Sequence, residues 1–258
     1  MTAPGHVVIT GAAGAIGAAL AREMRQAWPH AQLALVDRDG RALDVIVNEL
    51  GGAATAYLAD LADIDALEAL VARIETSGPI DALVNCAGIM RVQNIATWRW
   101  NDANTLLAIN LLAPLRLMDL VVRGMVERAA GLVINVSSMA GRVPLRGCTY
   151  YGAAKAGLAM ASEIARADLA SQGVQVITVY PGPVKSALEA GARADYGGGG
   201  MFGRFAPTGD PAELAARIME AVAADEPRVI YPRLYGVGWS APNFSRWVAL
   251  SYGPPPVS

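Results

Sequence analysis

The sequence predicts an α/β protein: a doubly wound parallel sheet of seven strands, in a single domain over residues 1–258, with an apolar helical tail at the C-terminus. Three observations predict this fold. Short apolar runs alternate with longer runs of helical character, a glycine-rich turn follows the first short run, and several short runs end in polar residues. With 258 residues, 53% of them hydrophobic, the chain is long enough to bury one large core.

Each short apolar run is expected to be a strand, and most of the runs between them are expected to be helices. The predicted strands are 6–10, 31–36, 53–58, 80–85, 132–136, 174–180 and 229–231. The predicted helices are 15–27, 40–50, 64–76, one from about 98 to 108 followed by one that ends near 128, 153–170 and 210–224. This alternation places helices on both faces of the sheet and ligands at the carboxyl ends of the strands.

Composition excludes several classes of partner. The net charge is −2, with 21 basic and 23 acidic residues interspersed, so no basic patch suggests nucleic acid. Cys86 and Cys148 are too few for a disulfide framework, which favours a reducing compartment and a cytoplasmic protein. The start of the chain lacks the features of a signal peptide, and no apolar run reaches the ~20 residues of a membrane span. His6 and His30 lie far from the polar stretch described next, so neither a histidine metal site nor a Ser-His-Asp triad is expected.

The stretch 137–155 brings together a hydroxyl, a phenol and an amine. Tyr151 and Lys155 are four residues apart at the start of a predicted helix, so their side chains share one face. An ammonium near a phenol, whose ordinary pKa is about 10, favours the phenolate and lowers that pKa. Lys155 is one of only two lysines among the 21 basic residues, which indicates that the planar guanidinium of an arginine could not replace the compact ammonium at this position. The alternative reading of the pair is an exposed Tyr and Lys without a role.

A glycine turn and an acidic residue form a second polar cluster. Gly11, Gly14 and Gly17 allow the backbone to approach a pyrophosphate at a helix N-terminus, although an ordinary strand-to-helix turn is the alternative. Asp37, at the end of the second predicted strand, accepts both ribose hydroxyls of adenosine and repels a 2′-phosphate. This favours NAD(H) and leaves NADP(H) possible, because Arg38 follows and would clamp a phosphate.

Three motifs together resemble the short-chain dehydrogenase/reductase family: T-G-A-A-G-A-I-G at 10–17, N-C-A-G at 85–88 and the stretch 137–155. The resemblance covers about residues 6–231. The glycine spacing departs from the single-domain branch, which has glycine where this chain has Ala15, and is more similar to a longer two-domain branch. Cys86 replaces an asparagine, and Ser186 stands where threonine is usual.

The resemblance implies a Rossmann fold and a set of site residues. Asn110, Ser138, Tyr151 and Lys155 are the implied catalytic residues, with Asn110 holding a proton-relay water. The implied cofactor-binding residues are Gly11, Gly14, Ile16, Gly17, Asp37, Arg38, Asp60, Leu61, Asn85, Ala87, Gly88, Tyr151, Lys155, Pro181, Gly182, Val184 and Ser186. Asn85 and Gly88 are expected to close the cofactor cleft and brace the sheet. Family members often pair two long helices between subunits, so a homodimer or homotetramer is expected.

The implied activity is an NAD(P)-dependent oxidoreductase that moves a hydride between nicotinamide and a secondary alcohol or ketone, with Tyr151 as general acid or base. The candidate substrate contacts are Met90, Val143, Leu145, Cys148, Met201, Phe202 and Phe205. Their apolar character suggests a steroid, terpenoid, aryl or acyl substrate. Arg142 and Arg146 are expected to face solvent, and contact with an anionic group of the substrate is the alternative. Alternatives are a catalytically silent binding or scaffold protein with this fold, and a ketoreductase committed to NADPH.

Two segments lie outside the motifs. Residues 187–207 contain four consecutive glycines, so they are expected to lack a stiff element and to form either a mobile substrate lid or a surface loop. The extension 236–258 suggests an amphipathic helix that covers the mouth of the site, contacts a neighbouring subunit or lies on a membrane surface. Its single Arg246 makes the membrane the least favoured of the three.

Overall fold

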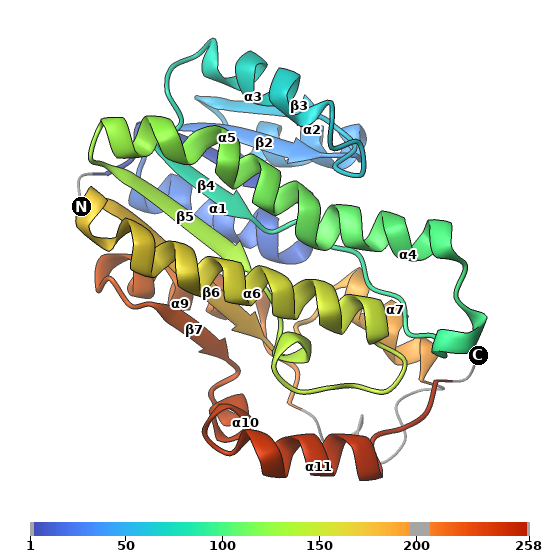
Figure 1. The fold of residues 1–258 in the computed structure, drawn as a ribbon. Helices are drawn as coiled ribbons and strands as arrows, with labels where there is room; N and C mark the ends of the chain where they lie inside the picture. Colours follow the sequence, from blue (N-terminus) through green and yellow to red (C-terminus); the bar gives the residue numbers. More distant parts are fainter. Residues whose placement is uncertain (1–2, 197–206, 257–258) are drawn as a thin grey trace.

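The computed structural model describes residues 3–196 and 207–256, apart from four side chains in the tail (Figure 1). Seven strands form one sheet in the order β3-β2-β1-β4-β5-β6-β7, and every pairing is parallel. The strands are β1 (His6–Thr10), β2 (Gln32–Asp37), β3 (Ala54–Leu58), β4 (Ala82–Asn85), β5 (Gly131–Val136), β6 (Val174–Pro181) and β7 (Arg228–Tyr231). The predicted fold class is confirmed.

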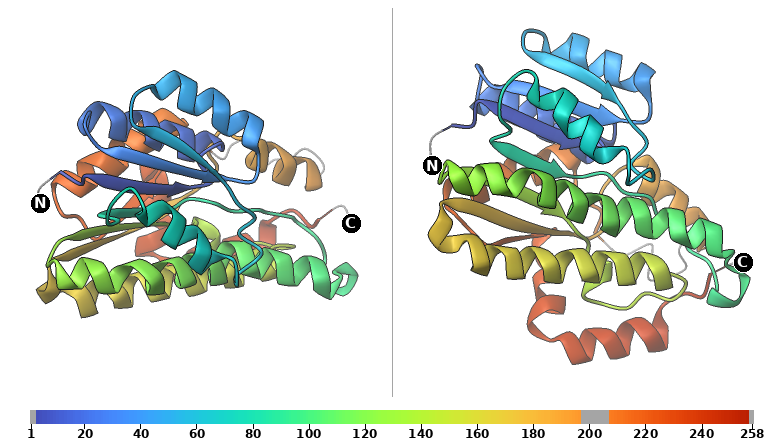
Figure 2. Two further views of the ribbon diagram at one scale, coloured as in Figure 1. Left: turned by 90° about the horizontal axis from the view of Figure 1, so that it is seen from above. Right: turned by 45° about the horizontal axis from the view of Figure 1, so that its top comes forward.

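Helices cover both faces of this sheet (Figure 2). One face packs against α1 (Ala15–Ala27), α2 (Gly40–Leu50) and α9 (Pro211–Ala223). The other face packs against α3 (Leu67–Glu75), α5 (Ala113–Glu127) and α6 (Thr149–Leu169). Because both faces are covered, β1, β4 and β5 are buried along their whole length.

The register of the central strands aligns four polar residues in one row near the carboxyl ends. Thr10 pairs with Asn85, Asn85 with Asn135, and Asn135 with Thr178. All four side chains are buried, so each needs hydrogen bonds. The Thr10 hydroxyl donates to the Val84 carbonyl and accepts from the Cys86 and Ala87 amides, which directs the chain after β4 across the end of β1.

The expectation that residues 187–207 lack a stiff element was wrong for their first half, because α7 (Ala187–Asp195) is a helix. Ser186 caps it by accepting the Glu189 amide at 3.1 Å, and the Glu189 carboxylate pairs with Arg193 one turn later. These local signals outweighed the neighbouring glycines. The prediction of a helical tail is confirmed by α10 (Gly236–Ser240) and α11 (Pro242–Tyr252).

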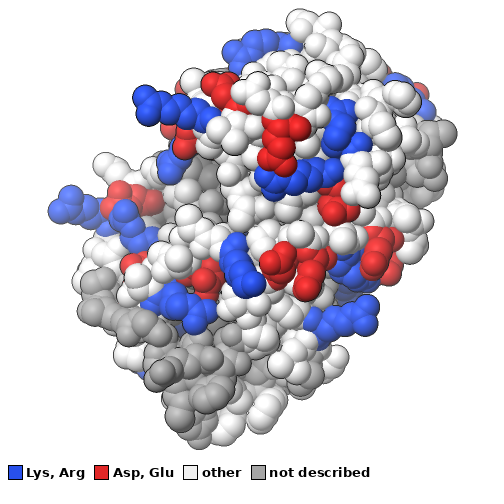
Figure 3. All heavy atoms as spheres, turned by 180° about the vertical axis from the view of Figure 1, so that it is seen from behind, with Lys and Arg blue, Asp and Glu red and all other residues white. Residues whose placement is uncertain are grey.

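One helical stretch, Trp100–Glu127, is long and apolar enough by composition to cross a membrane. It comprises α4 (Trp100–Leu107), the π-helical turn η2 (Ala108–Leu112) and α5, and it packs against α3, α6 and the sheet. Half of its most apolar window is buried inside the fold, as in the core helix of a globular protein. On the face shown in Figure 3, acidic and basic side chains are interspersed.

Candidate active site

A cavity of about 920 Å³ opens at the carboxyl ends of the strands. β1 pairs with both β2 and β4, so the strand order reverses there, and open α/β sheets bind ligands at such a switch point. One part of the cavity lies along the glycine turn and the ends of β2 and β4. The other part is enclosed by the loop after β5, the start of α6, α7 and α11.

The glycine turn needs two of its glycines for close backbone contacts. Gly11 has φ +66°, and a Cβ atom there would lie 2.7 Å from the Ala87 Cα atom. A Cβ atom on Gly17 would overlap the Gly11 carbonyl oxygen. Gly14 is the N-cap of α1 and provides no side-chain cap, so the first amides of this helix face the cavity that Gly14, Ile16 and Gly17 line. This N-terminus fits an anion such as a pyrophosphate.

Asp37 joins the end of β2 to the glycine turn. Its carboxylate accepts the Ala13 amide at 3.0 Å and the Arg38 amide at 2.7 Å. The carboxylate thus lies beside the turn and borders the cavity, where an adenosine ribose would meet it. The adjoining Arg38 side chain is exposed, and Asp60 and Leu61 line the same part of the cavity.

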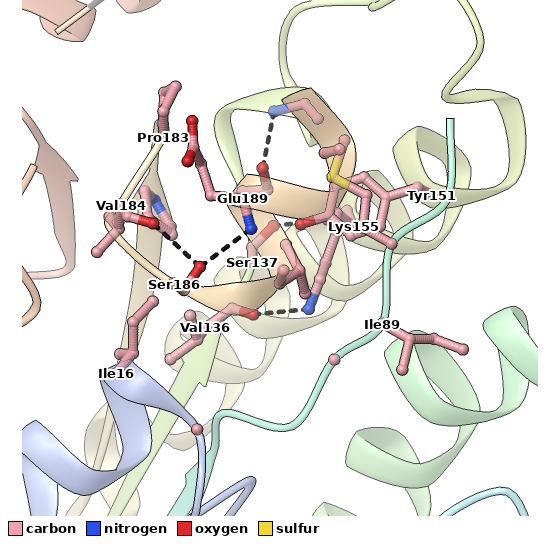
Figure 4. Close-up of a pocket in the computed structure, with 18 of the residues that line it drawn as sticks. Ile16, Ile89, Val136, Ser137, Tyr151, Lys155, Pro183, Val184, Ser186 and Glu189 are labelled. Carbon is pink, nitrogen blue, oxygen red and sulfur yellow. Dashed lines mark hydrogen bonds between the residues drawn. The ribbon is translucent and has the colours of Figure 1, made fainter. Parts of the chain in front are cut away.

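Lys155 is held by the end of β5 (Figure 4). Its Nζ atom donates to the Val136 carbonyl at 2.9 Å, and the Lys155 carbonyl accepts from the Ser137 hydroxyl at 2.7 Å. The side chain is only 4% exposed. Burial lowers the pKa of Lys155 to about 8, against a smaller opposing effect of Cys86. Ser137 is a site residue that the sequence analysis missed, although it is half of the S-S pair.

Tyr151 borders the cavity one turn before Lys155, and Ser138 borders the same cavity. Burial raises the pKa of Tyr151 to about 12, and the nearby Ser138 hydroxyl opposes this only in part. The sequence analysis predicted a pKa lowered by Lys155. In this structure the prediction is wrong, because burial dominates and the ammonium is turned towards the Val136 carbonyl.

Asn110 lies in the π-helical turn between α4 and α5, a distortion that often marks functional sites. Its amide nitrogen donates to the carbonyls of Ile89 and Leu106, and its Oδ1 atom is buried without a hydrogen-bond partner among the described residues. A Cβ atom added to Gly88 would lie 2.8 Å from this Oδ1 atom and 3.4 Å from the Nζ atom of Lys155. Gly88 therefore leaves a narrow space beside both groups.

Most of the predicted residues border one cavity. These are Gly11, Gly14, Ile16, Gly17, Asp37, Arg38, Asp60, Leu61, Ala87, Gly88, Met90, Ser138, Val143, Leu145, Tyr151, Lys155, Pro181, Gly182, Val184 and Ser186. Asn85, Asn110 and Cys148 are not among its lining residues. Met201, Phe202 and Phe205 lie outside the described residues.

Two of the exceptions have a clear physical reason. The Asn85 amide donates to Asn135 Oδ1 at 2.9 Å inside the fold, so its side chain braces the sheet and does not face a ligand. Cys148 is buried behind Tyr196, whose hydroxyl lies 3.4 Å from the cysteine sulfur and donates to the Arg146 carbonyl.

Two groups of lining residues carry no recognised motif. One group comes from α7 and its end: Leu188, Glu189, Ala192, Arg193 and Tyr196. The other comes from Tyr235 and the tail that follows it: Phe244, Ser245, Val248, Ala249, Gly253 and Pro254. The amphipathic pattern of the tail was visible in the sequence, but it did not indicate which surface the helix covers. Of the three expected positions of the tail, the structure has the one over the mouth of the site.

Lys185 and metal binding were also considered in the sequence, and neither contributes to the cavity in the part of the chain that the structure describes. Lys185 is exposed and lies 3.8 Å from the Asp210 carboxylate, as a surface ion pair does. Among the described residues, no group of three His, Cys, Asp or Glu side chains is arranged to hold a metal ion.

Comparisons with known proteins agree with this geometry. A family model described as short chain dehydrogenase matches residues 5–197. The chain belongs to the short-chain dehydrogenase family. Nodulation protein G of Rhizobium meliloti is 36% identical over 185 residues, which are 70% of this chain and 74% of the relative. The 3-oxoacyl-(acyl-carrier-protein) reductase FabG of Vibrio harveyi is 32% identical over 226 residues, which are 82% of this chain and 87% of the relative.

Solved structures of similar proteins extend the comparison to ligands. A short-chain dehydrogenase from Sphingobium yanoikuyae in complex with NADPH matches with a TM-score of 0.80 and 27% identity, covering 96% of this chain and 95% of that one. The bulky-bulky ketone specific alcohol dehydrogenase from Comamonas testosteroni matches with a TM-score of 0.78 and 25% identity, covering 96% and 94%. The glycine turn, Asp37 and the Lys155 region thus fit a nicotinamide dinucleotide.

Proposed function

We propose that this short-chain dehydrogenase transfers a hydride between a nicotinamide dinucleotide and the carbonyl or alcohol carbon of a hydrophobic substrate. The observation that carries the proposal is one continuous cavity. It joins a helix N-terminus bordered by Asp37 to a second region where Ser138, Tyr151 and Lys155 meet. A dinucleotide bound along the first region reaches the second, and a carbonyl group placed there meets the phenol.

The chain's own residues supply the binding. The free amides at the start of α1 hold the pyrophosphate, Asp37 accepts the adenosine ribose hydroxyls, and Lys155 holds the second ribose. When bound, the dinucleotide supplies or accepts the hydride. We propose a preference for NAD(H), because the Asp37 carboxylate repels a 2′-phosphate. NADP(H) is the alternative, since the similar Sphingobium yanoikuyae structure is a complex with NADPH.

Tyr151 is the proposed proton donor to the carbonyl oxygen. With its pKa raised to about 12, the phenol is fully protonated at neutral pH, which suits the reductive direction. Ser138 holds the same oxygen by a second hydrogen bond. Asn110 Oδ1, buried next to Lys155, is the proposed anchor for water that returns the proton to Tyr151.

The proposed substrate is a ketone or secondary alcohol with a bulky hydrophobic body of steroid, terpenoid, aryl or acyl type. Apolar side chains from the loop after β5, from α7 and from α11 support this choice, since Val143, Leu188 and Val248 all line the cavity.

We expect the protein to act as a cytoplasmic homodimer or homotetramer. Met160 and Ile164 on α6 are 63% and 52% exposed, which supports a contact between subunits there. Both cysteines are free thiols, which supports a reducing compartment.

Nicotinamide absorbance with NADH and a panel of ketones tests this function. We expect turnover with the wild type and a loss of at least about 1000-fold in kcat for Tyr151→Phe, with NADH binding retained. Tyr150→Phe is the matched control, because it removes a neighbouring hydroxyl from a ring that packs on Trp98. Undiminished turnover in Tyr151→Phe would remove Tyr151 from the mechanism. NADH binding without turnover of any ketone or alcohol would favour the silent binding protein.

A further inference from the structure

The tail forms one wall of the cavity, opposite the catalytic side chains. From α11 and the residues after it, Phe244, Ser245, Val248, Ala249, Gly253 and Pro254 border the cavity. Figure 1 shows α10 and α11 below the end of β7, beside the loop that leads into α6. This wall is not part of the sheet, so side-chain contacts must hold it against the rest of the protein.

Trp239 at the end of α10 makes the contacts that hold the wall. The guanidinium carbon of Arg142 lies 4.6 Å from its ring centroid, and that of Arg228 lies 4.8 Å away. The ring of Tyr180 meets the indole edge-on, with centroids 4.8 Å apart. Both arginines are within the range of cation–π attraction, and both aromatic rings are in a favourable arrangement.

One carboxylate lies close to the two positive charges around the indole. Glu163 lies 3.9 Å from the Arg228 guanidinium and accepts a hydrogen bond from the Tyr180 hydroxyl at 2.7 Å. One carboxylate thus offsets part of the repulsion between two guanidinium groups near one ring. The Nε atom of Arg228 is buried and has no hydrogen-bond partner in the described part of the chain. The side chain as a whole is 40% exposed, so the indole and Glu163 together stabilise the guanidinium.

The partners of Trp239 come from regions that matter for catalysis. Arg142 follows directly on the short turn η3 (Met139–Gly141), which Ser138 caps, and Arg228 begins β7. Met139 and Val143 pack in the same cluster as Trp239 and also border the cavity. The indole therefore connects the tail with the loop after Ser138 and with the last strand.

We propose that Trp239, clamped by Arg142 and Arg228, is a positioning residue that selects substrates by size. It acts by holding α11 as the apolar wall of the substrate region, and it touches neither the reacting atoms nor the dinucleotide. The proposal rests on the function proposed above. A bulky ketone uses the wall and depends on the clamp, whereas a small ketone beside Tyr151 does not.

Steady-state kinetics with two ketones tests the clamp. For Trp239→Leu we expect KM for a bulky aryl ketone to rise about tenfold, with kcat for a small aliphatic ketone unchanged within about twofold. Leu250→Ala is the control, because this residue is on the same tail but 52% exposed. Arg142→Gln should reproduce the effect of Trp239→Leu in part, and Arg142→Lys should restore the KM, since an ammonium also binds an indole face.

A second readout does not depend on turnover. Trypsin cleavage after Arg246, on the exposed side of α11, reports how firmly the tail is held. We expect faster cleavage in Trp239→Leu and Arg142→Gln than in the wild type and Leu250→Ala. Equal ketone selectivity and equal cleavage in Trp239→Leu and Leu250→Ala would overturn the proposal. If the wild type reduces neither ketone, the proposed function fails, and the cleavage rates still decide whether the clamp exists.

Discussion

The two regions of the cavity are built in different ways. The dinucleotide region consists of backbone and strand ends: the turn at Gly11, the start of α1 and the carboxylate of Asp37 at the end of β2. The substrate region consists of side chains on segments that leave the sheet, namely the loop after β5, α7 and α11. Tyr151, Ser138 and Lys155 lie where the two regions meet.

This difference indicates which substitutions each region tolerates. The hydrogen bonds of the sheet fix the position of each strand end. An atom added in the dinucleotide region therefore overlaps backbone that cannot move aside. In the substrate region, side-chain size sets the shape of the cavity and the backbone is further away. We expect the dinucleotide region to respond to changes in backbone space, and the substrate region to changes in apolar volume.

The largest contrast should come from the same substitution in each region. Gly17→Ala places a Cβ atom onto the Gly11 carbonyl, so we expect NADH affinity to fall about a hundredfold as the turn is displaced. Gly191→Ala, in α7, meets no atom within 4 Å. It should leave NADH affinity unchanged and stabilise the protein by about 0.5–1 kcal/mol. Fluorescence titration with NADH and urea unfolding measure both effects, and equal affinities in the two variants would remove the contrast.

Coenzyme preference sharpens the account of the dinucleotide region. For Asp37→Ser we expect the ratio of NADPH to NADH affinity to rise about 30-fold, since the variant loses a charged acceptor for the ribose hydroxyls and the repulsion of a 2′-phosphate. Asp44→Ser is the control, because it removes an exposed carboxylate of α2 that does not border the cavity. Paired titrations with NADH and NADPH measure this ratio of affinities. An unchanged ratio in Asp37→Ser would contradict the proposed preference for NAD(H).

The buried ammonium between the two regions gives a pH dependence of stability. Burial lowers the pKa of Lys155 from 10.5 to about 8, so between these values the unfolded state binds more protons than the folded state. The free energy of unfolding therefore rises with pH across this window. Between pH 7.5 and 9.5 we expect the wild type to gain about 2 kcal/mol relative to Lys155→Met in urea unfolding.

Comparison with the variant is needed because other groups titrate nearby. Burial raises the pKa of Cys86 to about 12 and that of Cys148 to about 11, and these thiols lower the stability above about pH 9 in both proteins. Tyr151, with a pKa of about 12 against an ordinary 10, acts in the same direction above about pH 10. If the free energy of unfolding changes with pH in the same way in the wild type and in Lys155→Met, the Lys155 ammonium is not desolvated.

The smallest effect is expected for a change of apolar volume in the substrate region. Val248→Ala removes two methyl groups from the α11 wall, so KM for a bulky ketone should rise about fivefold, with kcat nearly unchanged. Leu250→Ala, on the same helix but 52% exposed, should change neither constant. An equal effect of both substitutions would mean that α11 does not contact the substrate.

The sequence predicted the dinucleotide region because its signals are local. Gly11 directly follows a strand, Gly17 lies in the first turn of the next helix, and Asp37 ends the next strand, so periodicity and spacing are enough to place them. Tyr151 and Lys155 are likewise one helical turn apart. The environment of the Tyr151 phenol could not be predicted from nearby residues. Its pKa depends on how deeply the fold buries the ring, and on the Val136 carbonyl, which accepts a hydrogen bond from Lys155.

The substrate region was harder to predict because its contacts join distant parts of the chain. The glycines after Tyr196 hid the helix α7, whose capping serine and i,i+4 ion pair were readable locally. Arg142 is exposed, as expected, but its guanidinium also lies over the ring of Trp239, 97 positions later, which the sequence did not indicate. Cys148 was expected to meet the substrate but lies behind Tyr196. Such pairings follow from tertiary packing, which no single segment encodes.

A crystal structure with the oxidised dinucleotide and an unreactive ketone together tests the central claim most directly. The account predicts that the ketone oxygen lies within hydrogen-bond distance of both the Tyr151 hydroxyl and the Ser138 hydroxyl, with the pyrophosphate at the start of α1. A ketone oxygen turned away from Tyr151, or a dinucleotide bound outside this cavity, would contradict it.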